Sequence, residues 1–208
     1  MYLNFNKTKI VWIIFFACLI SCSSPIKYYT SGDFEKVSKI DSHFHYLTLD
    51  KRYMKFADSL NFRLLSPNWD WKNTMDEQME ISESIRNSFP GKYAFFGTFS
   101  VDSFNSPGFA EKTIARIKEC IAGGASGIKI WKNIGMVLTD KNGKFVMIDD
   151  PAFEPVFRYL QDNNIPVIGH LGEPKDCWLP FDKMTDPSDV GYYKENPQLS
   201  TSFSCFWI

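Results

Sequence analysis

The chain has 208 residues, of which 44% are hydrophobic and 23% are charged, a composition typical of one globular domain. Its formal net charge of −1 excludes the strongly basic surface with which proteins bind nucleic acid. The sequence contains no low-complexity tract and no repeat of the lengths that build solenoids.

The N-terminal residues have the pattern of an export signal. Lys7 and Lys9 precede an apolar run over residues 10–20, which is too short to span a bilayer. The letters LISC at residues 19–22 resemble the bacterial lipobox. This resemblance implies cleavage before Cys22 and attachment of lipid to its thiol. The alternative is a plain secretory signal, with Cys22 an incidental residue.

These features predict a signal peptide over residues 1–21 and a turn-rich tether over residues 22–35. Ser23, which follows the cysteine, favours sorting to the outer membrane of a Gram-negative cell, facing the periplasm. The lipid is the only part of the mature protein expected to enter a membrane. Beyond Cys22 three cysteines remain, an odd number without CxxC spacing, so no disulfide framework is indicated.

From residue 36 onward, short apolar runs alternate with segments of helical periodicity. Strands are predicted at residues 36–43, 62–66, 93–100, 127–131 and 165–170. Helices are predicted at residues 50–60, 74–89 and 110–121, and from residue 150 onward. Thr74 and Glu77 stand at the spacing of a capping box. The alternation predicts an α/β fold with βα units on a parallel sheet.

Two architectures share this alternation, a doubly wound sheet and a (β/α)8 barrel. Polar residues near the C-terminal ends of the predicted strands favour the barrel, because a barrel brings several strand ends to one point. These residues are His43 and His45, Lys129 or Lys132, and His170 with Glu173. The sequence has no GxGxxG motif and no P-loop to support a nucleotide site on a doubly wound sheet.

His43 and His45 are the first candidate metal ligands. Alternate residues of a strand point to the same side, so both imidazoles can approach one ion at the roughly 2.0–2.1 Å of a zinc–nitrogen bond. His170 is the only other histidine of the chain, and it ends another predicted strand. The alternative is a pair of polar histidines satisfied at a strand edge. Asp41 is expected either to fix a histidine tautomer or to serve as a turn residue.

Three segments in order carry a family resemblance. KIDSHFHY (39–46) resembles the first-strand motif of the amidohydrolase-related (amidohydrolase 2) family, a branch of the metal-dependent hydrolase superfamily. GGASGIKIWKNIGM (123–136) and NNIPVIGHLGEP (163–174) resemble its fourth and fifth strands. The resemblance covers residues 37–198. It implies a (β/α)8 barrel that holds one or two divalent ions, often zinc.

The resemblance also implies a set of metal ligands. His43 and His45 match the first-strand ligands, and His170 matches the fifth-strand ligand. Lys129 is similar in position to a lysine that some members carboxylate to bridge two metals. Strand parity leaves open whether Lys129 or Lys132 faces the site, and a Lys129 that faces solvent is a further alternative.

Other polar and aromatic residues near the strand ends are assigned to the substrate pocket. Trp131 ends the fourth predicted strand, Lys132 follows it, and Glu173 follows the fifth. Aromatic side chains at such positions often line a pocket, although packing under long loops is the alternative. Glu173 has the alternative role of capping a loop.

The implied activity is metal-dependent hydrolysis of a small carbonyl substrate such as a lactone, amide or ester, although some relatives decarboxylate instead. A divalent ion lowers the pKa of bound water toward about 7 and polarises the carbonyl group. The alternative function is a non-catalytic lipoprotein that binds a ligand in the barrel mouth. Metal content separates the two, because only the enzyme requires the ion.

The chain departs from the family pattern in its length. A complete barrel typically needs about 250 residues and eight strands, and five strands are predicted here. The proton-shuttling aspartate of the family comes from the eighth strand, so no catalytic residue is assigned. We expect residues 36–198 to form a partial barrel of about five βα units and residues 199–208 to be an aberrant tail. The chain is then expected to be a truncated, inactive version of the enzyme.

Overall fold

The computed structural model describes residues 28–70, 74–170, 172–197 and 200, and it divides into units of residues 1–37 and 38–208. The predicted signal peptide, and Cys22 with it, lie outside the described residues. In the first unit, the 3-10 turn η1 (Ser31–Asp33) is closed by hydrogen bonds from the Thr30 backbone N–H and hydroxyl to the Asp33 carboxylate. Within the described ranges, no helix has the length and apolar character needed to cross a membrane.

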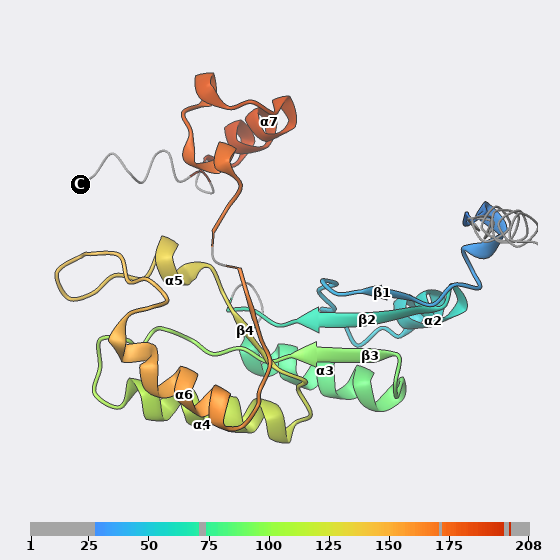
Figure 1. The fold of residues 1–208 in the computed structure, drawn as a ribbon, viewed down its shortest axis with the longest axis horizontal. Helices are drawn as coiled ribbons and strands as arrows, with labels where there is room; N and C mark the ends of the chain where they lie inside the picture. Colours follow the sequence, from blue (N-terminus) through green and yellow to red (C-terminus); the bar gives the residue numbers. More distant parts are fainter. Residues whose placement is uncertain (1–27, 71–73, 171, 198–199, 201–208) are drawn as a thin grey trace, which may run out of the picture. The chain divides into compact units, whose positions relative to one another are not determined.

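Parallel strands form the centre of the second unit (Figure 1). β1 (Lys39–Asp41), β2 (Phe62–Pro67) and β3 (Tyr93–Phe96) make one sheet in that order. β4 (Ile128–Ile130) and β5 (Val167–Gly169) make a second parallel pair.

A bridge between Gly97 and Ile128 continues the pairing from β3 to β4, and the Lys129 N–H donates to the Gly97 carbonyl over 2.7 Å. Strands of the described chain therefore neighbour one another in chain order. The predicted parallel α/β fold is confirmed, and the described residues do not form a closed barrel.

A helix lies between each pair of consecutive strands. These helices are α2 (Arg52–Ser59), α3 (Met75–Ser88), α4 (Phe109–Ala122) and α6 (Glu154–Asp162). The excursion after β4 contains α5 (Asn133–Met136) and η2 (Pro151–Phe153), and β5 is followed by η3 (Lys175–Trp178), η4 (Phe181–Lys183) and α7 (Pro187–Glu195). α4 and α6 pack side by side (Figure 1).

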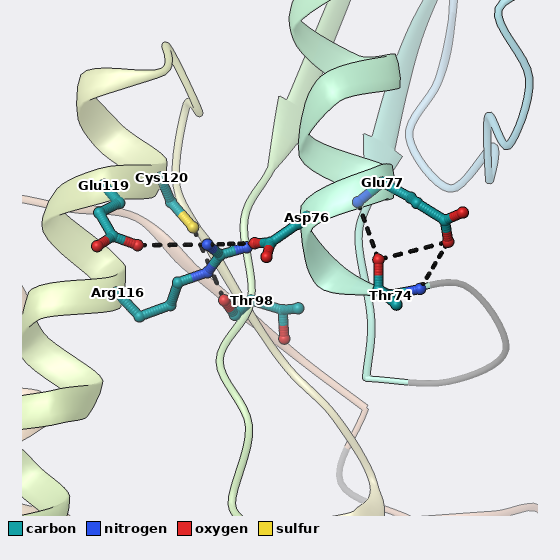
Figure 2. A network of polar contacts seen from close by, with 7 residues as sticks. All are labelled: Thr74, Asp76, Glu77, Thr98, Arg116, Glu119 and Cys120. Atoms are coloured by element: carbon teal, nitrogen blue, oxygen red, sulfur yellow. Dashed lines mark hydrogen bonds and ion pairs between the residues drawn. The ribbon is translucent and has the colours of Figure 1, made fainter.

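The predicted capping box at the start of α3 is confirmed (Figure 2). The Glu77 N–H donates to the Thr74 hydroxyl over 3.1 Å, and the Glu77 carboxylate accepts the Thr74 N–H over 3.0 Å. Asp76, which precedes Glu77 in the first turn, pairs with Arg116 of α4 over 2.8 Å. This ion pair joins two consecutive helices of the layer.

α4 approaches the end of β3 closely because the strand is followed by a glycine. A Cβ atom at Gly97 would lie 2.5 Å from both the Cβ and the Sγ of Cys120. The Cys120 thiol donates to the neighbouring Thr98 carbonyl over 3.7 Å (Figure 2). Cys120 and Cys177 are both buried.

The hydrophobic core lies between strands and helices. Its fully buried members include Phe95, Ile117, Ile128, Phe153 and Val156. The rings of Phe104, Phe109 and Phe153 pack against one another with centroids 5.2–5.5 Å apart. These aromatic contacts anchor the loop after β3 to the start of α6.

The strands β1 and β5 both end earlier than predicted, before the histidines that follow them. The strand predicted over residues 36–43 is too long, because β1 ends at Asp41. The Asp41 carboxylate accepts the backbone N–H of His43 over 3.0 Å, and this local hydrogen bond replaces the regular ladder. β5 likewise ends at Gly169, one residue before His170. All three histidines therefore stand just beyond strand ends.

Candidate metal site

His43 and His45 meet directly after β1. Their Nε2 atoms lie 3.1 Å apart, and their ring centroids lie 4.9 Å apart. Two nitrogens that bind one zinc ion tetrahedrally at about 2.05 Å would be separated by about 3.3 Å. The spacing of the two imidazoles therefore fits a shared ion. Without an ion, one ring donates a hydrogen bond to the other, and the tautomers decide which.

The imidazole of His45 is half-buried and neutral at neutral pH. Burial is the main cause that lowers its pKa to about 4, and the neighbouring His43 and Lys129 add to the shift, while the Pro67 carbonyl opposes it. Its Nδ1 atom is buried without a hydrogen-bond partner of good geometry in the described chain. A neutral imidazole keeps a lone pair, which is the form that binds a metal.

His43 is more exposed, but its pKa is shifted in the same direction. Burial lowers the pKa first and the charge of Lys129 adds to this, whereas Asp41 raises it. Asp41 contacts the backbone of His43 and forms a turn there. Of the two roles considered for Asp41, the structure thus shows the turn.

Lys129 lines an open cavity of about 480 Å³ together with His43 and His170. The remaining lining residues are Ser42, Leu65, Ile168, Gly169 and Gly172. Lys129 is the central residue of β4, opposite Ile168 of β5, and only 2% of its surface is exposed. Burial lowers the pKa of its ammonium group. The structure therefore places Lys129 at the cavity, and Lys132 is not among the lining residues.

The three residues assigned to the substrate pocket gather beside His170. Lys132 forms an ion pair with Glu173, and its Nζ lies 5.2 Å from the centre of the Trp131 ring. The second carboxylate oxygen of Glu173 is 3.8 Å from His170 Nε2. The Trp131 and His170 rings pack edge to face with centroids 5.2 Å apart. Trp131, Lys132 and Glu173 thus form a rim group next to the cavity.

His170 shares the cavity with His43, but it stands apart from the histidine pair. Its backbone N–H donates to the Ile130 carbonyl over 3.0 Å, which extends the pairing of β5 with β4. Burial lowers the pKa of its imidazole, and the charges of Lys132 and Lys129 add to this. Among the residues that the structure describes, no three His, Cys, Asp or Glu side chains come close enough to hold one ion. The arrangement is a ligand pair, with a third imidazole that lines the same cavity as His43.

Two residues near the histidine pair form part of the site. The Trp69 ring packs against His45 with centroids 3.7 Å apart, and it lies 6.3 Å from the Trp131 ring. Gln78 of α3 binds the backbone of Trp69 through two hydrogen bonds. No sequence motif marks Gln78 as a site residue. Its only signal is a polar residue, with Ser82 four residues later, on the buried face of a predicted helix.

Compared with models of known protein families and with curated proteins, the chain matches none. Its function is therefore inferred from the geometry of its own side chains and from the sequence resemblance.

Proposed function

We propose that the chain carries the metal-binding half of an amidohydrolase-type site, and that a complete site of this type hydrolyses a small carbonyl substrate. The observation that carries the proposal is the 3.1 Å separation of His43 Nε2 and His45 Nε2 beside a cavity that Lys129 and His170 also line. The resemblance of segments 39–46, 123–136 and 163–174 to one family supports it independently.

We also propose that the parallel strands are part of a (β/α)8 barrel. In a doubly wound sheet, the strand order reverses at a central switch point. Here β1, β2 and β3 are adjacent in chain order, and the Gly97–Ile128 bridge leads on to β4 and β5 without a reversal. A helix separates each consecutive pair of strands. This order supports a singly wound sheet of the barrel type.

His43 and His45 are the residues that would hold the ion, and their imidazole nitrogens favour zinc among the common divalent metals. When bound there, a divalent ion supplies Lewis acidity, which polarises a substrate carbonyl and lowers the pKa of a bound water molecule. The lowered pKa values of both histidines keep their lone pairs available at neutral pH. Lys129 and His170 face the same cavity and can complete the ligand set or contact the substrate.

The cavity and its rim suit a small polar substrate. A volume of about 480 Å³ accommodates a compact lactone, amide or ester. Lys129 can donate a hydrogen bond to an oxygen on which negative charge develops. Trp131 and the Lys132–Glu173 pair lie beside His170, where they can contact the part of the substrate that extends out of the cavity.

Metal content tests the proposal directly. The full chain is purified, stripped with a chelator and titrated with zinc, and both binding and hydrolysis of a panel of lactones, esters and amides are measured with and without the ion. We expect one zinc ion per chain in the wild type and loss of it in His43→Ala and His45→Ala, with Lys132→Ala as a control that keeps zinc. A wild-type chain that binds no zinc overturns the proposal. Ligand binding that persists in chelator would favour the non-catalytic alternative.

A further inference from the structure

The side chain of Gln78 holds the backbone of Trp69 at both of its polar groups. The amide oxygen of Gln78 accepts the Trp69 N–H over 3.0 Å, and the amide nitrogen donates to the Trp69 carbonyl over 2.7 Å. Gln78 is 1% exposed, so water does not compete for these bonds. Two hydrogen bonds to one residue fix both the position and the rotation of its peptide groups.

A second residue on the same face of α3 holds the preceding position of the loop. Ser82, four residues after Gln78, donates from its hydroxyl to the side-chain oxygen of Asn68 over 3.2 Å. The Asn68 N–H donates to the Phe96 carbonyl over 3.0 Å, so the pairing of the strands extends beyond the end of β2. Ser82 therefore holds Asn68, whereas Gln78 holds Trp69.

The Trp69 ring packs against His45 of the histidine pair, so the position of the Trp69 backbone affects the position of His45. Trp69 is 8% exposed and packs against His45 with centroids 3.7 Å apart at an interplanar angle of 66°. The Pro67 carbonyl acts on the His45 imidazole, but His45 Nδ1 makes no hydrogen bond of good geometry in the described chain, so ring packing adds to the weak orientation that this carbonyl gives. The ring orientation of His45 decides whether its Nε2 faces His43.

We propose that Gln78 is a positioning residue for the histidine pair, acting through the Trp69 backbone and ring on His45. The expected effect on metal affinity rests on the proposed metal site, but the contacts from Gln78 through Trp69 to His45 do not. Loss of the Gln78 bonds frees the Trp69 peptide groups, lets the indole shift, and releases the imidazole from the orientation in which the two Nε2 atoms meet. Positioning partners of this kind typically change metal affinity about 10- to 100-fold.

The test compares Gln78→Met with Ser82→Ala in the full chain. Both variants remove polar groups from the same face of α3, so both are expected to lower the melting temperature. Only Gln78→Met is expected to shift the ¹H and ¹⁵N signals of the His45 imidazole in metal-free protein. Gln78→Met is also expected to lower the affinity for Co²⁺ at least tenfold. This affinity is measured from the visible absorption of bound Co²⁺. Ser82→Ala is expected to keep both properties within about twofold of the wild type.

Three outcomes overturn the inference. One is a folded Gln78→Met protein with unchanged His45 signals, and another is an equal loss of Co²⁺ affinity in both variants, which would indicate a general effect of stability. If Gln78→Met does not fold, Trp69→Phe replaces it, because this variant keeps the backbone hydrogen bonds and has a smaller ring. Unchanged His45 signals in Trp69→Phe are the third outcome that overturns the inference. A wild type that binds no Co²⁺ or Zn²⁺ refutes the metal site instead, while the imidazole signals still decide the role of Gln78.

Discussion

Lys132 forms an ion pair with Glu173 in the rim group beside His170, whereas Lys129 lines the cavity. From strand parity alone, either Lys129 or Lys132 could face the site. In the structure the surroundings of the two lysines differ. Lys129 is buried and makes no ion pair within the described ranges, whereas Lys132 has a carboxylate partner and an aromatic ring beside it.

This difference predicts opposite effects of removing the two charges. Lys129→Met is expected to raise the free energy of unfolding by about 1 kcal/mol, because burial that lowers the pKa of Lys129 also makes its charge costly. Burial lowers the pKa of Lys132 as well, but Lys132→Met is expected to lower the free energy of unfolding by about 1 kcal/mol, because Glu173 loses its partner in a partly buried place. Urea unfolding at pH 7.5 measures both. Equal destabilisation would show that Lys129 gains a favourable contact from its charge.

The close approach of α4 to β3 makes Gly97 a sensitive position. A methyl group there would meet the Cβ and Sγ of Cys120 at 2.5 Å, so Gly97→Ala is expected to cost about 1–3 kcal/mol of stability. Gly191 in α7 is the matched control, since no described atom beyond its chain neighbours and its own helix backbone lies within 4 Å of the added Cβ. Gly191→Ala is expected to be neutral or to stabilise by up to about 1 kcal/mol. Denaturant unfolding compares the two, and a neutral Gly97→Ala would contradict the packing.

The helices before β4 could be predicted from the sequence because their signals are local. Thr74 and Glu77 have the spacing of a capping box, and the structure forms both of its hydrogen bonds. α4 follows from an apolar stripe that ends at Gly123. α7 has no such stripe, so it was not predicted. Its only local signal is Asp186 as the N-cap with Pro187 as the first helical residue.

The site could be predicted in part, because the spacing of His43 and His45 is also a local signal. Two histidines at i and i+2 after an apolar run indicate side chains on one face, and the structure brings them into contact. The strand itself ends earlier than predicted, because the Asp41 side chain competes for the His43 N–H. The Gln78–Trp69 contact joins a helix face to backbone only nine residues earlier in the chain, through side-chain hydrogen bonds that follow no regular period. A single sequence carries no signal for such a pairing.

Lipid attachment is predicted at Cys22. In a bacterial host with a lipoprotein pathway, the wild-type chain is expected to incorporate labelled fatty acid and to fractionate with the outer membrane. Cys22→Ser is expected to abolish the label and leave the protein unprocessed or soluble in the periplasm. Cys18→Ser is the matched control, since Cys18 lies within the predicted signal peptide and is removed with it. Labelling of the Cys22→Ser variant would refute the assignment.

Stability is predicted to fall in mild acid, because folding lowers the pKa of all three histidines. For His45 the pKa drops from 6.5 to about 4, so between these values the unfolded chain binds a proton that the folded chain does not. Its contribution is therefore complete above about pH 6.5 and is lost as the pH falls toward about 4. Because the ring is only half-buried, we expect this loss to be about 1–2 kcal/mol.

Urea unfolding of metal-free protein at pH 7.5, 6 and 5 measures this loss, with His45→Gln as the comparison. Glutamine cannot titrate, so the variant is expected to show a shallower decline of the unfolding free energy with falling pH. His43 and His170 remain in the variant, and their lowered pKa values leave a residual slope of the same sign. An identical slope in wild type and variant would mean that His45 is not kept neutral by burial. The neutral imidazole pair would then lose its physical basis.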